Sequence, residues 1–154
     1  MEGLERIVLA HPLFAGLDAE LGELVAGCAR NHRFDPGTYL GREGELANEI
    51  FLIRHGKVAL EVLPPGQSAS VFATQGVGEI VGASWLVPPY RWRFDARAVE
   101  LTRAIGIDAQ CLRNKCETDH HLGYAMMKCF LPLVMQQLDD TRLQIQDVYR
   151  TRTK

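Results

Sequence analysis

The sequence lacks the features of a membrane-inserted or exported chain. No run of 18 apolar residues occurs in its 154 positions, so we predict no membrane-spanning helix. Glu2, Glu5 and Arg6 interrupt the first ten positions and exclude a signal-like apolar start. Basic residues are not in excess either, because 17 Lys and Arg stand against 19 Asp and Glu, and a net charge of −2 provides no broad surface for nucleic acid. We expect a cytoplasmic protein that contacts neither membrane nor DNA.

Catalytic and metal-binding motifs are missing as well. The sequence contains no Gly-x-Ser-x-Gly, no His-Glu-x-x-His and no Walker loop, so we predict no enzymatic activity and no catalytic residue. Its cysteines are Cys28, Cys111, Cys116 and Cys129. They are too few and too scattered for a disulfide framework, and a reducing compartment fits them better. Cys111, Cys116 and His120 or His121 do not have zinc-finger spacing, so we expect buried thiols and no metal site.

The composition instead suits one globular domain over residues 1–154. Hydrophobic residues make up 47% of the chain and charged residues 23%, which is enough for an adequate core. Three blocks follow one another. The pattern predicts a helical N-terminus over 1–30, a turn-rich segment over 31–107 and C-terminal helices over 108–150.

The first block predicts two helices and the second a set of short strands. Pro12 ends the first helix, and Asp18 is a good N-cap for the second. In the second block, Ile50–Ile53 and Lys57–Val62 flank the dipeptide His55–Gly56, for which a tight hairpin is the simplest interpretation. Turns recurring at such short intervals favour an antiparallel roll or barrel over a parallel sheet.

The last block predicts a long helix with two apolar faces. One line of residues repeats at alternating spacings of three and four, the pattern of a coiled-coil contact. This line consists of Tyr124, Met127, Leu131, Val134, Leu138, Thr141, Ile145 and Val148. A second line through Leu122, Met126, Cys129 and Leu133 is available to pack on the chain's own roll. We therefore predict that the first line is a homodimer interface, and that Pro132 bends the helix without ending it.

Residues 78–98 have the frame of a phosphate-binding cassette. Gly78 and Gly82 bracket a short apolar run that leads into Ala83 and Ser84, at the start of one helical turn. Free backbone N–H groups at such a turn can face an anion. Gly82, Ala83 and Ser84 are therefore candidate ligand-binding residues.

The order of these parts resembles a known family. The shared pieces are Phe34–Thr38, Arg42–Gly44, Ile50–Val58, Gly78–Gly82 and Leu138–Tyr149. Through them nearly the whole chain is similar to the cyclic-nucleotide-binding domain, in particular to the sensor half of the bacterial catabolite-activator and fumarate-nitrate-regulator superfamily. The resemblance implies an α+β, mainly β fold. It would be a β-jelly roll, or double-stranded β-helix, flanked by N-terminal helices and a long C-terminal dimerisation helix.

Two positions depart from what the resemblance implies. In nucleotide-binding members a Glu after the second cassette glycine takes the ribose hydroxyl, and an Arg further along grips the cyclic phosphate. Ungapped, these positions fall on Ala83 and Trp92, which can do neither. Arg91 and Arg93 flank Trp92, and a one-residue bulge could restore a guanidinium, although on a regular strand both point to the opposite face. Trp85, Tyr90 and Trp92 could fill the old pocket, which we favour, or form a wall for another planar ligand.

Three functions remain open. The one we predict is a stand-alone regulatory homodimer with cyclic-nucleotide binding lost or altered, which signals to a separate protein partner. The first alternative is a functional cyclic AMP or cyclic GMP sensor that uses Arg91 or Arg93 for the phosphate. The second is the sensor part of a transcription regulator without its DNA-binding domain, because only Arg150–Lys154 remain for a helix-turn-helix unit. No cofactor is expected other than a cyclic nucleotide or another small anion.

Overall fold

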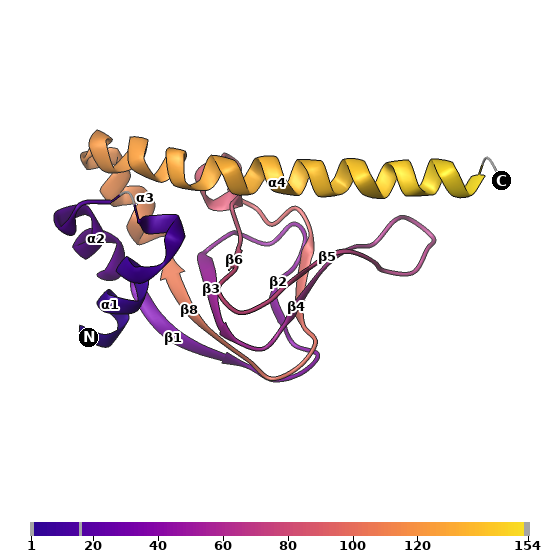
Figure 1. Cartoon of the computed structure of the whole chain (residues 1–154), viewed down its shortest axis with the longest axis horizontal. Coiled ribbons are helices and arrows are strands. Elements are labelled where there is room, and N and C mark those ends of the chain that lie inside the picture. Colours follow the sequence, from indigo (N-terminus) through magenta and orange to yellow (C-terminus); the bar gives the residue numbers. More distant parts are fainter. Residues whose placement is uncertain (1, 16, 153–154) are drawn as a thin grey trace.

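Helices lie at both ends of the sequence and strands lie between them (Figure 1). The computed structural model describes residues 2–15 and 17–152, and it describes side chains over 3–15 and 17–143. The strands are β1 (Ala29–Phe34), β2 (Tyr39–Gly41), β3 (Glu49–His55), β4 (Val58–Val62), β5 (Ser70–Gln75), β6 (Ile80–Val81), β7 (Asp95–Ala98) and β8 (Thr102–Asp108). The helices are α1 (Glu2–Ala10), α2 (Ala19–Ala26), α3 (Ala109–Thr118) and α4 (His120–Arg152), with short 3-10 segments η1 (Pro12–Phe14) and η2 (Ser84–Leu86).

The strands form two antiparallel sheets. Sheet A has the order β1-β8-β3-β6, and sheet B has the order β2-β7-β4-β5. Together with the flanking helices, this is the mainly β, α+β jelly-roll architecture predicted from the sequence, so the fold class is confirmed. Within the part of the chain that the structure describes, no helix combines the length and the apolar character needed to cross a bilayer.

The N-terminal segment follows the predicted pattern of caps. α1 ends before Pro12, and Oδ1 of Asp18 accepts a hydrogen bond from the N–H of Leu21 at 2.9 Å, which confirms Asp18 as the N-cap of α2. The boundary of the roll differs slightly from the prediction. β1 begins at Ala29 instead of 31, because the chain turns into sheet A directly after α2 ends.

The connection at His55–Gly56 is not the tight hairpin expected from the sequence. β3 pairs with β8 and β6, whereas β4 pairs with β5 and β7, so the two strands belong to different sheets. Gly56 has φ of +99°, and a Cβ atom there would overlap the carbonyl oxygen of Leu101. The turn signal was correct, but it marks a crossing from sheet A to sheet B.

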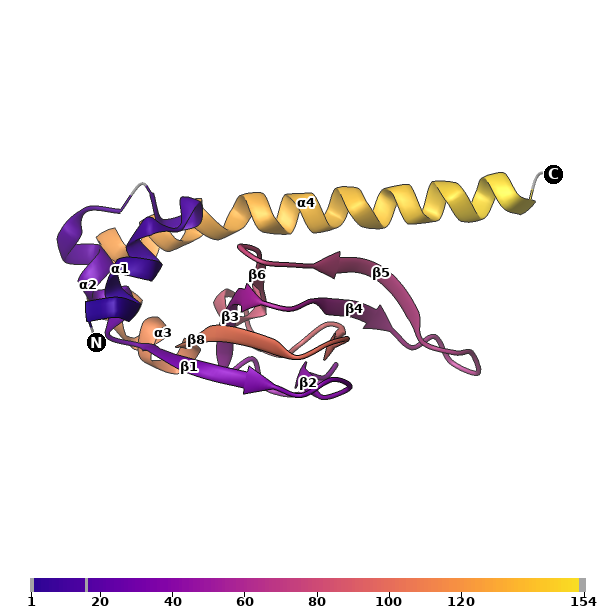
Figure 2. The ribbon, with the colours of Figure 1, turned by 60° about the horizontal axis from the view of Figure 1, so that its bottom comes forward.

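Helix α4 lies along one side of the roll, above β5 and β6 in Figure 2, and it continues through Pro132. Leu122 and Met126 are fully buried on the side that faces the roll, and Cys129 and Leu133 are packed against the same core. The second apolar line of the sequence therefore covers the chain's own domain, as predicted.

The first apolar line stays exposed on the single chain. Tyr124 exposes 62% of its surface and Leu138 exposes 43%. The exposed members in the described part are Tyr124, Met127, Leu131, Val134, Leu138 and Thr141. Ile145 and Val148 lie on α4, but their side chains fall outside the described residues. This apolar face of α4 is therefore free to pack against another protein surface.

A disulfide joins Cys28, just after α2, to Cys111 in the first turn of α3. The expectation that the cysteines are too scattered to pair is wrong for these two, which lie 83 residues apart with Cα atoms at 6.0 Å. The reason is strand pairing. Ala29 lies opposite Ile107 in the antiparallel pair β1–β8, so the residues that flank this pair become neighbours. Cys116 and Cys129 are free and half-buried.

Reducing this disulfide should destabilise the protein. Because the bond closes a long loop in the unfolded chain, we expect dithiothreitol to lower the free energy of unfolding by about 2–4 kcal/mol. Urea denaturation with and without reductant measures the difference. Cys111→Ser should remove the response to reductant, and Cys129→Ser should keep it. A wild-type protein indifferent to reductant would contradict the pairing.

Candidate ligand-binding site

The cassette begins where β6 ends. Gly82, Ala83 and Ser84 follow β6 and lead into η2. Within the described residues, the N–H groups of these three donate no hydrogen bond to a backbone carbonyl. η2 turns Trp85 inward, where its ring meets Phe130 of α4 with ring centroids 5.3 Å apart. The cassette is therefore packed against the long helix through Trp85, while its N–H groups stay free.

Trp92 points into the roll. Trp92, Phe94 and Ala96 are buried, whereas Arg91 and Arg93 are exposed, which is the alternation of a regular extended segment. Trp92 itself is only 5% exposed. No extra residue interrupts the alternation, so neither arginine is turned inward.

An aromatic cluster centred on Trp92 fills the space between the sheets. Its indole stacks on Phe51 with 6.4 Å between centroids and 24° between planes, and meets Phe94 edge-on at 5.8 Å. Phe34 packs against Phe51 at 5.4 Å, and Phe72 packs against Phe94 at 5.5 Å. Aromatic pairs of this kind contribute about 0.5–1.5 kcal/mol each beyond their buried area. The cluster runs from β1 to β5, so it ties sheet A to sheet B.

Two glycines border the indole. A Cβ atom at Gly41, in β2, would overlap Cε2 of Trp92, so a glycine there leaves room for the ring. A Cβ atom at Gly82 would lie 3.5 Å from Cη2 of Trp92, an ordinary van der Waals contact. The indole therefore lies beside the second cassette glycine.

Arg91 and Arg93 lie on the outside of the roll. Nη1 of Arg91 donates a hydrogen bond to the carbonyl oxygen of Gly44 at 2.7 Å, and Arg91 forms an isolated antiparallel bridge with Leu46. Arg93 is exposed, and in the described part of the chain it forms no ion pair. The structure thus brings Gly82 and Trp92 together and leaves both arginines apart from them.

Arg113 and Tyr90 hold the loop between η2 and Trp92. Nη1 of Arg113, on α3, donates to the carbonyl oxygen of Trp85 at 3.0 Å, and its guanidinium lies 4.4 Å from the centre of the Tyr90 ring. Tyr90 has φ of +59°, a left-handed conformation that costs about 1–3 kcal/mol for a residue with a side chain. The N–H of Ala47 donates to the Tyr90 carbonyl at 2.7 Å and helps to hold it.

Sequence analysis missed Arg113, Gly41 and Phe51 as parts of this site. An arginine on a helix and a single glycine in a strand belong to no motif, and Phe51 lies in the shared piece Ile50–Val58, which gives it no role in a site. Only the packing around Trp92 reveals what these residues do. The one available signal was a tryptophan at a position where the resemblance implies an arginine.

A depression that contains two glutamates lies beside Trp92. It measures about 480 Å³ and is lined by Leu40, Gly41, Glu45, Leu46, Asn48, Glu49, Phe51 and Trp92. Oε1 of Glu49 accepts a hydrogen bond from Arg30 at 2.9 Å, and its Oε2 lies 2.5 Å from Nε2 of His32. The hydrogen bond to Glu49, and next its negative charge, raise the pKa of Arg30.

The cysteines and acidic residues do not gather around a common point. No group of three or more His, Cys, Asp or Glu side chains within the described residues could hold a metal ion. Burial, and then the nearby charges of Glu117 and Asp119, raise the pKa of the Cys116 thiol. Burial also raises the pKa of Cys129. A raised pKa keeps a thiol protonated near neutral pH and makes it a poor metal ligand.

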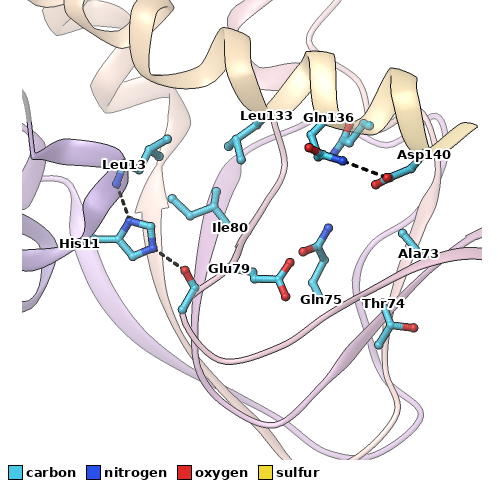
Figure 3. Close-up of a pocket in the computed structure, with 12 residues that line it drawn as sticks. His11, Leu13, Ala73, Thr74, Gln75, Glu79, Ile80, Leu133, Gln136 and Asp140 are labelled. Atoms are coloured by element: carbon cyan, nitrogen blue, oxygen red, sulfur yellow. Dashed lines mark hydrogen bonds between the residues drawn. The ribbon is translucent and has the colours of Figure 1, made fainter.

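A second depression, of about 290 Å³, joins the start of the cassette to α4 (Figure 3). Nδ1 of His11 accepts a hydrogen bond from the N–H of Leu13 at 3.0 Å. Its Nε2 therefore carries the proton and donates to the carbonyl oxygen of Gly78 at 2.5 Å. Across the depression, Nε2 of Gln136 donates to Asp140 at 3.1 Å on α4. The N-terminal segment thus holds the turn that leads into the cassette.

Comparisons with known proteins agree with this fold. Residues 31–119 match the family model described as cyclic nucleotide-binding domain. The chain is similar to a solved protein from Geobacter metallireducens that is described as a putative cyclic nucleotide-binding protein, with 27% identity, a TM-score of 0.79, and coverage of 90% of this chain and 99% of that one. It shares its fold with the sensor domain of the transcriptional regulator DNR from Pseudomonas aeruginosa, at 18% identity, TM-score 0.70, and coverage of 90% and 95%. The chain also shares its fold with the regulatory domain of Toxoplasma gondii PKA, solved with cAMP, at 16% identity and TM-score 0.70, with coverage of 90% of this chain and 49% of that one. No curated protein matches the chain.

Gly41→Ala tests the position of the indole. Because the added methyl group would overlap the ring, β2 or Trp92 must shift, and we expect the free energy of unfolding to fall by about 1–3 kcal/mol. Gly76→Ala is the control, because a Cβ atom there meets nothing within 4 Å, and it should change stability by less than about 0.5 kcal/mol. Urea unfolding followed by tryptophan fluorescence measures both. Equal effects of the two substitutions would contradict the packing of Trp92 on Gly41.

Proposed function

Because this chain belongs to the cyclic nucleotide-binding domain family, we propose that it is a regulatory module whose cyclic-nucleotide binding is lost or altered. One observation carries the proposal. The buried indole of Trp92 reaches Gly82 and stands where the family resemblance implies an arginine for the cyclic phosphate. The ring takes up volume that the phosphate would need, and it carries no positive charge to pair with the phosphate.

The charges around the cassette support the same proposal. A cyclic phosphate needs charge-assisted donors, and Ala83 and Trp92 provide none through their side chains. Arg91 would have to release the carbonyl oxygen of Gly44 and turn through the strand to reach the interior. The functional sensor that uses Arg91 or Arg93 is therefore the weaker candidate. The free N–H groups of Gly82, Ala83 and Ser84 leave room for an altered ligand, such as a smaller anion.

The module is proposed to act as a homodimer through α4. A stripe that includes Tyr124, Met127 and Leu131 is exposed along the helix, which is unusual for a monomer. Its spacing of three and four residues matches the seam between two parallel or antiparallel helices, so a second copy of the same helix is the occupant that fits it. The opposite face of α4 is already used, because Leu122 and Met126 are buried in the core.

The output of the module is proposed to be a contact with a separate protein in the cytoplasm, with no catalysis and no direct DNA contact by this chain. Members of this family are regulatory in type, and no catalytic motif occurs in the sequence. A transcription regulator's sensor remains the alternative role, since the fold is shared with the sensor domain of DNR. Both roles use the same dimer and the same cassette.

We predict that wild-type protein does not bind cyclic AMP at micromolar concentration. Loss of the Glu and the Arg removes charge-assisted hydrogen bonds of about 1.5–3 kcal/mol each, which weakens binding by a few orders of magnitude. Calorimetric titration with cyclic AMP and cyclic GMP measures this. Trp92→Arg together with Ala83→Glu should create binding, whereas Arg93→Gln should change nothing. Micromolar binding by the wild type that Arg91→Ala or Arg93→Ala abolishes would support the sensor instead.

Leu138→Asp should convert the dimer into a monomer. A carboxylate in the middle of the apolar seam must either be buried in the interface, at a cost of several kcal/mol, or keep the helices apart. Leu143→Asp is the matched control, because Leu143 is exposed on α4 but lies off the seven-residue line. Sedimentation equilibrium should show a monomer for the first variant and a dimer for the second. A dimer in both cases would refute the seam.

A further inference from the structure

Three arginines from adjacent strands border one depression on sheet A. Arg33 lies on β1, Arg103 on β8 and Arg54 on β3. Figure 2 shows β1 and β8 side by side, on the side of the roll away from α4. The depression measures about 510 Å³, and its apolar lining includes Ile7 and Ile105. This volume is in the range of small-ligand sites, about 300–1,000 Å³. The depression shares no residue with the cassette.

The strand register places like charges opposite each other. Arg33 lies directly opposite Arg103 across the pair β1–β8. On the other side of β8, His55 lies opposite the same Arg103. Like charges directly opposite each other destabilise a sheet. An anion bound between the guanidinium groups would offset this repulsion.

An irregularity in β3 adds the third guanidinium. Ile53 lies opposite Ala104 and His55 opposite Arg103, so Arg54 is an extra residue without a partner of its own. β-bulges of this kind redirect a side chain and are frequent beside functional sites. Here the redirected side chain borders the same depression as the other two arginines.

Acidic side chains do little to neutralise this cluster. Oδ1 of Asp35 lies 3.7 Å from Arg33, with the two side chains 71% and 65% exposed, and such exposed pairs contribute little to stability. No carboxylate of the described residues forms an ion pair with Arg54 or Arg103. The positive charges are thus concentrated and largely unpaired in a chain whose net charge is −2.

We propose that Arg33, Arg54 and Arg103 form a binding site for a small ligand that carries an oligophosphate group. Guanidinium groups bind phosphate oxygens through paired, charge-assisted hydrogen bonds, and three of them match a multiply charged anion. The apolar lining formed by Ile7 and Ile105 accommodates an uncharged part of the same ligand. The site lies outside the roll and does not depend on what the cassette binds.

Calorimetric titration at low salt, with tripolyphosphate and with ATP as separate probes, tests the site. We expect wild-type protein to bind at least one probe with a Kd below about 1 mM, and to lose affinity as salt screens the charges. Tighter binding of ATP would identify a nucleotide-like ligand that uses the apolar lining. Equal affinities would identify the oligophosphate alone. Absence of binding to both probes overturns the proposal.

Variants separate binding from folding. Arg103→Gln and Arg54→Gln should each raise the Kd about tenfold, whereas Arg142→Gln, with the same charge change on the exposed face of α4, should leave it unchanged. Without ligand, Arg103→Gln should raise Tm by about 1–3 °C, because it removes the repulsion from Arg33. Arg103→Lys, which keeps the charge without the planar fork, should retain part of the affinity. Unchanged binding by Arg103→Gln would contradict the site, whatever the effect of this substitution on Tm.

Discussion

The packing of the Trp92 indole between the two sheets is the contact on which the rest of the structure depends. It stacks on Phe51 of sheet A and meets Phe94, which continues through Phe72 to sheet B. The ring fits because position 41 carries no side chain. Trp92 is large and only 5% exposed, so it supplies much of the apolar contact inside this small roll. Replacing it with alanine would lower the free energy of unfolding by about 3–5 kcal/mol.

In the proposed function, the same indole also limits what the cassette can bind. The ring lies beside Gly82, where a bound nucleotide would need space. The cassette is also in contact with the C-terminal helices and with the N-terminal segment. Trp85 packs on Phe130 of α4, Arg113 of α3 holds the Trp85 carbonyl, and His11 holds Gly78. A change at the cassette would therefore reach α4 directly, which is what a regulatory module needs whatever its ligand is.

Much of the fold followed from the sequence, because turns, caps and apolar periodicity are local signals. The N-cap at Asp18, the buried face of α4 and an antiparallel roll were all predicted from such signals, and the family resemblance specified a jelly roll. The failures concern contacts between distant segments. The turn at His55–Gly56 does not say which strands pair, and the disulfide of Cys28 with Cys111 depends on the register of β1 with β8. At the site, the sequence pointed to the cassette turn and to Trp92, which breaks the family pattern, whereas Gly41 and Arg113 act through packing and carry no such signal.

The central claim is that the Trp92 indole occupies the nucleotide position and is not displaced. Fluorine NMR of protein labelled with 5-fluorotryptophan tests this directly, because the chain has two tryptophans and Trp85→Phe leaves the Trp92 signal alone. The account predicts one sharp Trp92 resonance, characteristic of a buried ring, whose position does not change as cyclic AMP is added to millimolar concentration. A resonance that shifts and saturates with cyclic AMP would show that the indole moves aside for the nucleotide, and would contradict the account.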